Sequence, residues 1–135
     1  RLYLYTSEGA MLLKRKAYDS LTTCLRGRVA YICLTARDFR RAGVPKSEIE
    51  DVIDIPRSIP TAQVSFFFYE TKDKPGLTRL SIRTRGDNDS FSAASIAAHF
   101  GGGGHLRAAG CDIKSSPKAA IETVKAYLAS RYLYI

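Results

Sequence analysis

The sequence predicts a single α/β domain in which helices pack on a mixed β-sheet of about five strands. Short apolar runs typical of strands are interspersed with segments that carry helix-capping signals. Their order is strand, strand, helix, helix, strand, strand, helix, strand, helix, which fits a mixed sheet covered by helices. The length of 135 residues suits one domain with its own hydrophobic core.

The first half of the chain is expected to contain strands and helices marked by turns and caps. Leucine and tyrosine recur at roughly helical spacing near the N-terminus, where a helix could connect to an upstream domain. Thr35 and Ser47 are each followed three residues later by an acidic side chain, the capping-box pattern of a helix start. The expected elements are a helix over residues 2–13, an antiparallel strand pair over residues 18–25 and 28–34, a helix from Thr35 to Arg41, a helix from Ser47 through Ile53, and an irregular passage bracketed by Pro56 and Pro60.

The second half is expected to hold a hairpin, a helix, a short strand and a terminal helix. Residues 62–70 form a nearly continuous apolar run, as in a buried central strand. Ser116 followed by Pro117 is a strong helix start, because proline fits the first helical position. The expected elements are strands over residues 62–70, 77–85 and 108–113, a helix capped by Asp89 and Ser90 that carries Ile96, Ala97 and Phe100 and ends at glycines 101–104, and a terminal helix that buries Ala120, Ile121, Val124 and Leu128.

The strand over residues 77–85 alternates apolar and polar side chains. Leu80 and Ile82 fall on one face, whereas Ser81, Arg83 and Arg85 fall on the other. Two guanidinium groups on one face suit bidentate binding of phosphate. The same pattern also fits the solvated face of a half-buried strand, so alone it is a weak signal.

Four consecutive glycines, Gly101–Gly104, followed by His105 and Arg107 form the most informative motif. Ordering glycine costs more backbone entropy than ordering any other residue, so four in a row need a reason. Glycine lets a ligand approach the backbone closely and lets successive amide N–H groups cradle an anion. His105 can donate to a phosphate or ribose oxygen, and Arg107 adds positive charge. A helix C-cap followed by a loop accounts for one glycine better than for four.

Composition limits the classes of function. A net charge of +8 favours a polyanionic partner such as nucleic acid, although a basic soluble surface explains it about equally well. The apolar runs are too short to cross a membrane, and no signal-peptide pattern opens the chain. Cys24, Cys33 and Cys111 lack metal-binding or redox spacing and fit a reducing cytoplasm. The glycine run is neither a dinucleotide fingerprint nor a Walker loop, since the required spacing and ending are absent.

The strand motif and the glycine run together resemble a known family. The segments Leu80-Ser-Ile-Arg-Thr84 and Ile96-Ala-Ala-His-Phe-Gly-Gly-Gly-Gly-His-Leu-Arg-Ala-Ala-Gly110 resemble the DHH-associated C-terminal domain of DHH phosphoesterases. The most similar type is the bacterial oligoribonuclease that also acts as a 3′-phosphoadenosine 5′-phosphate phosphatase. Segments 27–35 and 53–59 look like it too, so the resemblance covers roughly residues 26–135. Residues 1–25 are then an interdomain linker and the start of the domain.

The resemblance implies a substrate-binding domain that works beside a catalytic N-terminal DHH domain. That other domain would hold manganese and hydrolyse short oligoribonucleotides and bisphosphorylated nucleotides, and this chain would bind the substrate. The residues implied to bind the phosphate or nucleotide are Arg83, His105 and, through the backbone, Gly102, Gly103 and Gly104, with Ser81 and Arg107 as weaker transfers.

The chain departs from the complete family pattern in one respect. It has no Asp-His-His triplet, and its only histidines are His99 and His105. A two-metal hydrolytic site needs several carboxylates and imidazoles that converge on the ions. We therefore expect no catalytic metal in this chain, no activity from it in isolation, and no role for His99.

Two other classes of function remain open at this stage. The C-terminal domain of alanyl-tRNA synthetase is a distant relative with a glycine-rich motif, so the chain could be a stand-alone RNA-binding module. It could also be a dimerisation domain, and a homodimer is compatible with either binding function. A preference for ligands of two to five nucleotides would distinguish a nuclease domain from a module for structured RNA.

Overall fold

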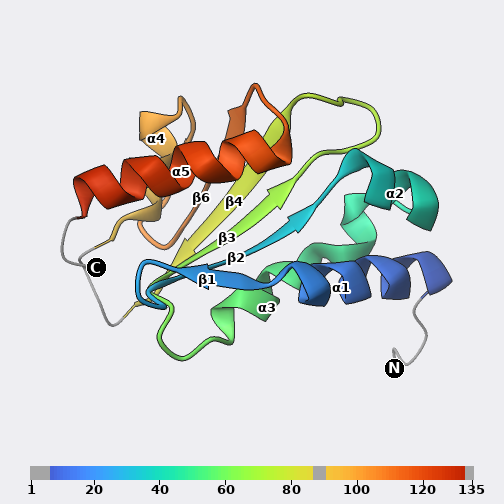
Figure 1. The fold of residues 1–135 in the computed structure, drawn as a ribbon, viewed down its shortest axis with the longest axis horizontal. Coiled ribbons are helices and arrows are strands. Elements are labelled where there is room, and N and C mark those ends of the chain that lie inside the picture. The colour runs from blue at the N-terminus through green and yellow to red at the C-terminus, as the bar shows by residue number, and fades with distance from the viewer. Residues whose placement is uncertain (1–6, 87–90, 133–135) are drawn as a thin grey trace.

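A six-stranded mixed sheet with helices on both faces forms the framework of the structure, a computed structural model that describes residues 7–86 and 91–132 (Figure 1). The strands lie in the order β1-β2-β3-β4-β6-β5; β2 and β3 are parallel and the other neighbours antiparallel. The strands are β1 Thr22–Cys24, β2 Val29–Leu34, β3 Val64–Tyr69, β4 Thr78–Thr84, β5 Gly103–Gly104 and β6 Ala108–Ile113. The helices are α1 Glu8–Ser20, α2 Ala36–Ala42, the 3₁₀ helix η1 Lys46–Ile53, α3 Asp54–Arg57, α4 Ala93–His99 and α5 Pro117–Arg131.

The predicted α/β class with a mixed sheet is confirmed, with one strand more than the five expected. The extra strand is β5, which pairs Gly103 with Gly110 and Gly104 with Ala109. The sequence prediction treated these glycines as the end of a helix and as a backbone approach to a ligand, not as a strand. Their pairing with β6 makes them the edge of the sheet.

Helices α1, α2, η1 and α3 cover one face of the sheet, over β2 and β3 (Figure 1). Because β2 and β3 are parallel, the chain between them must cross back over the sheet, and α2, η1 and α3 form that crossover. Leu13, Phe39 and Ile49 from these helices pack with Ile32 of β2 and Phe67 of β3. Among the described residues, this buried cluster contains none from β4, β5 or β6.

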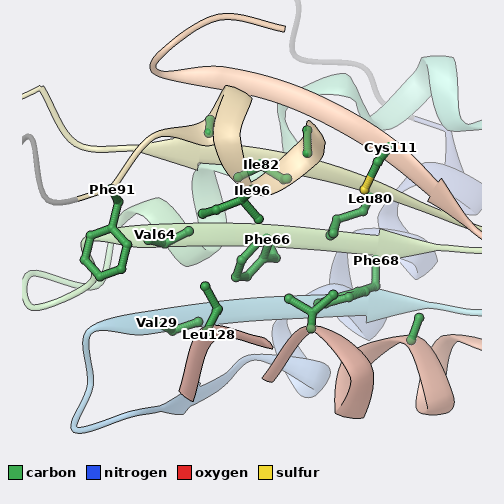
Figure 2. Close-up of a cluster of buried hydrophobic side chains, with 14 residues drawn as sticks. Val29, Val64, Phe66, Phe68, Leu80, Ile82, Phe91, Ile96, Cys111 and Leu128 are labelled. Atoms are coloured by element: carbon green, nitrogen blue, oxygen red, sulfur yellow. The ribbon is translucent and has the colours of Figure 1, made fainter. Parts of the chain in front are cut away.

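Helices α4 and α5 cover the opposite face (Figure 1). Figure 2 shows the core beneath them, in which Phe66 and Phe68 of β3 lie with Leu128 of α5. Leu80 and Ile82 of β4 point into the same core, as their alternation predicted. Burying each such side chain contributes roughly 1.5–3 kcal/mol, so this core fixes which face of β4 is left for other contacts.

The N-terminal boundary differs from the prediction. A helix was expected over residues 2–13 and a strand over residues 18–25, but α1 runs from Glu8 to Ser20 and β1 begins at Thr22. The hydroxyl of Ser7 accepts from the N–H of Ala10 and caps the helix. Ala10, Leu13 and Ala17 lie on the buried side of α1. Two of these three are alanines, which carry little hydrophobic signal, so the helical period was hard to see. Residues 2–6 lie outside the described part.

Several predicted caps are confirmed and others are wrong. Thr35 and Asp38 form the reciprocal capping box at α2, and Ser116 caps α5 ahead of Pro117. Ser47 caps nothing: η1 begins at Lys46 without a side-chain cap. Pro56, expected in an irregular passage, lies in α3, which follows η1 directly. The expected cap at Asp89 and Ser90 lies outside the described residues, and Ser92 caps α4.

No helix in the described part of the chain is long and apolar enough to cross a membrane.

The half-buried thiol of Cys33 on β2 is expected to lower the stability of the domain at alkaline pH. Burial raises the pKa of this thiol to about 12, and the carboxylates of Asp38 and Glu70 add to the shift. The unfolded chain releases the proton near pH ~8.5, so the stabilisation is complete below that pH and is lost as the pH rises toward the folded pKa. We expect the free energy of unfolding, measured with urea, to fall less steeply in Cys33→Val than in wild type above pH ~8.5. Equal slopes would contradict this.

Candidate functional site

One half of the sheet has a face that no helix covers among the described residues. The helices α1 to α3 stop at β3, so the next strands present side chains on that side without a packing partner. Cross-strand pairing places Arg79, Ser81 and Arg83 of β4 on this side, next to Asp112, Gly110 and Ala108 of β6 in the same order. Gly103 of β5 continues the row that contains Ser81 and Gly110. We call this side of β4, β6 and β5 the open face.

A cleft of about 500 Å³ lies at one end of the open face. It runs between α3 and the C-terminal end of β4, and β3 contributes to its floor. Its lining is mostly polar and contains three arginines against one aspartate. The lining residues are Asp54, Arg57, Ser58, Ala62, Gln63, Ser65, Arg83, Thr84, Arg85 and Gly86. We call it the arginine cleft.

A second hollow, of about 410 Å³, lies toward the other end of the open face. It is floored by β4 and β6 and bordered by the first glycines after α4. The lining residues are Tyr69, Arg79, Leu80, Ser81, Phe100, Gly101, Gly102, Gly110, Cys111 and Asp112. Its arginine is partly neutralised, because Nε of Arg79 lies 3.7 Å from Oδ1 of Asp112. We call it the glycine hollow. Of the two hollows, the arginine cleft has the larger excess of cationic side chains among its lining residues.

Arg83 lies where the sequence placed it, on the exposed side of β4. Its Nη1 donates to the carbonyl oxygen of Ile82 at 3.0 Å. Within the described residues its guanidinium forms no ion pair, which leaves most of its N–H donors for a ligand. Its cross-strand neighbour on β3 is Ser65, which also lines the arginine cleft.

The four glycines serve different purposes. Gly101 has φ +84° and follows α4 in a left-handed conformation. A Cβ on Gly102 would lie 2.2 Å from the carbonyl oxygen of Gly110, and one on Gly104 would lie 2.5 Å from Cα of Ala109. These two glycines let β5 pack tightly against β6. A Cβ on Gly103 would meet nothing within 4 Å, so packing does not require glycine there.

His105 and Arg107 do not line either hollow. The backbone N–H of His105 donates to the carbonyl oxygen of Ala108 at 2.7 Å and closes the turn between β5 and β6, with the residue exposed. Arg107 is half-buried and its Nη2 lies 3.5 Å from the carbonyl oxygen of Gly86. The structure thus brings Arg83 and Arg85 into the arginine cleft and Ser81 and Gly102 into the glycine hollow.

Among the lining residues that had no assigned role in the sequence prediction are four polar residues that the hollows bring to the open face or its edge. Arg57 and Gln63 come from the segment before β3, and Ser65 and Arg79 come from strands β3 and β4. Ser65 could have been found from the sequence, because it is the one small polar residue within the apolar run Val64–Tyr69. Nothing in the sequence alone shows that α3 carries Arg57 to the end of β4.

His99, for which no role was expected, lies at the edge of the core. Its ring stacks on Tyr127 of α5 at 3.8 Å between centroids, and it meets Phe100 edge-on. Across residues 7–86 and 91–132, no group of three or more His, Cys, Asp or Glu side chains could hold a metal ion. The manganese implied by the family resemblance therefore finds no fitting donor set in the described part of this chain.

In the described part of the chain, the fold and the open face define an α/β domain with an arginine-lined cleft beside an uncovered half of its sheet. The chain belongs to the DHHA1 domain family, whose model matches residues 27–130; this is the DHH-associated C-terminal domain of DHH phosphoesterases. An exopolyphosphatase-related protein from Bacteroides fragilis has a similar structure, with 25% identity, a TM-score of 0.82, and coverage of 98% of this chain and 38% of that protein. A pGpG-specific phosphodiesterase, PggH from Vibrio cholerae, shares the fold at 11% identity and a TM-score of 0.56, over 95% of this chain and 40% of that protein.

The chain therefore spans well under half the length of either solved structure. The family assignment made from Leu80–Thr84 and the segment Ile96–Gly110 with its glycine run is confirmed.

Proposed function

We propose that this chain is the substrate-binding domain of a phosphoesterase that hydrolyses short oligoribonucleotides and bisphosphorylated nucleotides. A manganese-containing DHH domain of the same protein would carry out the hydrolysis, and the pair would work in the cytoplasm. The observation that supports this most directly is the open face. There, Arg83 presents a guanidinium that forms no ion pair within residues 7–86 and 91–132, beside a floor of glycine and serine.

The open face suits a nucleotide phosphate for physical reasons. A planar guanidinium donates two parallel N–H groups to phosphate, an arrangement stronger and more directional than a neutral hydrogen bond. Gly110 is the cross-strand neighbour of Ser81 and Gly103 is that of Gly110, and because both glycines lack side chains they leave the backbone accessible to a ribose or a flat base. The family membership and the pGpG-specific phosphodiesterase with the same fold both fit a nucleotide ligand.

The role of this domain in turnover would be positional. The partner domain would hold the metal ions, which would supply Lewis acidity and an activated water for hydrolysis. Arg83 neutralises charge on a phosphate next to the reacting one, and the row Ser81–Gly110–Gly103 sets the position of the attached nucleoside. Holding the substrate in this way removes translational and rotational entropy before the chemical step.

The test is a comparison of ligand lengths by fluorescence anisotropy at two salt concentrations. A labelled dinucleotide should bind this chain more tightly than a structured transfer RNA or a single-stranded RNA of twenty nucleotides. Affinity should weaken at the higher salt concentration, because counterions compete for the phosphate contacts. Tighter binding of the structured RNA would instead support an RNA-binding module of the alanyl-tRNA synthetase type.

Gly103→Ala should weaken dinucleotide binding without changing stability. The added methyl group meets nothing within the protein, so it projects into the space that the ligand would occupy. We expect affinity to fall about five- to tenfold, as when an added group displaces a close backbone contact. Isothermal titration calorimetry gives the affinity, and thermal unfolding of the same sample gives the stability. Unchanged affinity would remove β5 from the binding site.

A further inference from the structure

The arginine cleft extends beyond what one phosphate on Arg83 requires. It lies on the β3 side of Arg83, whereas the glycine strand lies on the β6 side. Its volume of about 500 Å³ falls within the range of small-molecule sites. A ligand that uses Arg83 and the glycine row would therefore leave this cleft open for another part of the same molecule.

The charge of the cleft favours an anion. Arg57 enters from α3, and Arg83 and Arg85 enter from β4 and its end. Among the described lining residues Asp54 is the only acid, and its Oδ1 lies 3.0 Å from Nη1 of Arg57. Both side chains of this pair are more than half exposed, so the pair is weak. A guanidinium has five N–H donors, and a phosphate can compete with Asp54 for those of Arg57.

The wall of the cleft also contains an unsatisfied polar atom. Oε1 of Gln63 is shielded from solvent and lacks a hydrogen-bond partner. Such atoms are rare in folded proteins, but this one is an acceptor shielded from the cleft, so it offers no contact to a phosphate. The hydroxyl-bearing Ser65, only 4% exposed, lies on the floor beside Arg83. Donors from α3, β3 and β4 thus converge on one concavity.

We propose that the arginine cleft is a second anion subsite that takes a terminal phosphate of the substrate, with Arg57 as its specific residue. This proposal rests on the proposed function, because it assumes that a nucleotide lies on the open face with an internal phosphate at Arg83. The substrate class is then a short nucleotide with a terminal phosphomonoester. Arg83 lines this cleft and would also hold the internal phosphate, whereas Arg57 belongs to the second subsite alone.

Substitution of Asp54 should raise the affinity for a terminal phosphate, whereas substitution of Arg57 should lower it. The carboxylate of Asp54 lines the same cleft and occupies one donor of Arg57. It therefore repels a bound phosphate and competes with it. Asp54→Asn keeps the size of the side chain and removes the charge, so it should raise affinity for a terminally phosphorylated ligand.

The experiment compares three dinucleotides of one sequence by isothermal titration calorimetry: one with a 5′-phosphate, one with a 3′-phosphate and one with neither. Wild type should bind one phosphorylated form about tenfold more tightly than the unphosphorylated one, as expected for a charge-assisted bidentate contact. Arg57→Ala should remove that preference and leave the affinity for the unphosphorylated ligand unchanged. Asp54→Asn should enlarge the preference about two- to threefold.

Arg40→Ala is the matched control, since it removes one exposed arginine from α2, outside both hollows; it should leave the preference unchanged. Arg57→Lys should restore only part of the preference, because lysine lacks the planar fork. The subsite is overturned if wild type shows no preference, or if Arg57→Ala weakens all three ligands equally. If the subsite fails in this way but the unphosphorylated dinucleotide still binds in a manner that depends on Arg83, the proposed function stands. If wild type binds none of the three dinucleotides, both the subsite and the proposed function are contradicted.

Discussion

Gly104→Ala is expected to lower the free energy of unfolding by about 3 kcal/mol or more. The new Cβ would lie 2.5 Å from Cα of Ala109 and 2.7 Å from the carbonyl oxygen of Ala108. Overpacking of this kind costs roughly 1–3 kcal/mol. The φ of +152° is one that L residues rarely adopt, which adds a further cost on the order of 1–3 kcal/mol. Urea unfolding followed by circular dichroism measures the loss.

Gly103→Ala is the control for this prediction, one residue away on the same strand. Its Cβ meets nothing within 4 Å and its backbone needs no left-handed φ. We expect its free energy of unfolding to stay within about 0.5 kcal/mol of wild type, as for most substitutions at exposed positions. If Gly104→Ala proved as stable as Gly103→Ala, the tight pairing of β5 with β6 would be wrong.

Arg83→Ala is expected to weaken dinucleotide binding about ten- to hundredfold. A hydrogen bond from a charged group contributes about 1.5–3 kcal/mol, and each 1.4 kcal/mol changes affinity tenfold. The half-exposed side chain of Arg83 hydrogen-bonds only to the carbonyl of Ile82 within the described residues, so stability should change little. Calorimetric titration with a dinucleotide gives the change in affinity.

Two variants separate the guanidinium from its charge. Arg83→Lys keeps the charge but not the planar fork, and should recover only part of the affinity. Arg40→Ala is the control for net charge, because it removes an equal charge at a distance from the open face. Arg40 lies on α2, which follows the C-terminal end of β2, and β2 and β4 run in opposite directions, so Arg83 near the C-terminal end of β4 lies at the other end of the strands. Arg40→Ala should bind as wild type does. Equal losses in Arg40→Ala and Arg83→Ala would mean that overall charge, not the open face, drives binding.

Elements with strong local signals were predictable from the sequence. The capping box of Thr35 and Asp38, the start of α5 at Ser116, and the burial of Leu80 and Ile82 follow from neighbouring residues alone. The weakly marked start of the chain was not, because alanines on the buried side of α1 give a helix little hydrophobic periodicity.

The candidate site was predictable only where it follows a single strand. Alternation along β4 placed Ser81 and Arg83 on one exposed face. The cleft beside them depends on a crossover that brings Arg57 of α3 against the end of β4, which no local pattern encodes. The sequence prediction assigned Gly102, Gly103 and Gly104 alike to ligand approach. The structure shows that Gly102 and Gly104 serve strand packing, and of these three glycines Gly103 is free of that need.

The central claim is that a short nucleotide binds to the open face, and a two-dimensional amide NMR titration tests it most directly. A chain of 135 residues is small enough for residue-by-residue assignment. On addition of a dinucleotide, we expect the amide signals of Ser81, Arg83, Gly103 and Gly110 to shift, while those of α1 and α5 stay in place. Shifts concentrated on α1 and α2, or no shifts at millimolar ligand, would contradict the account.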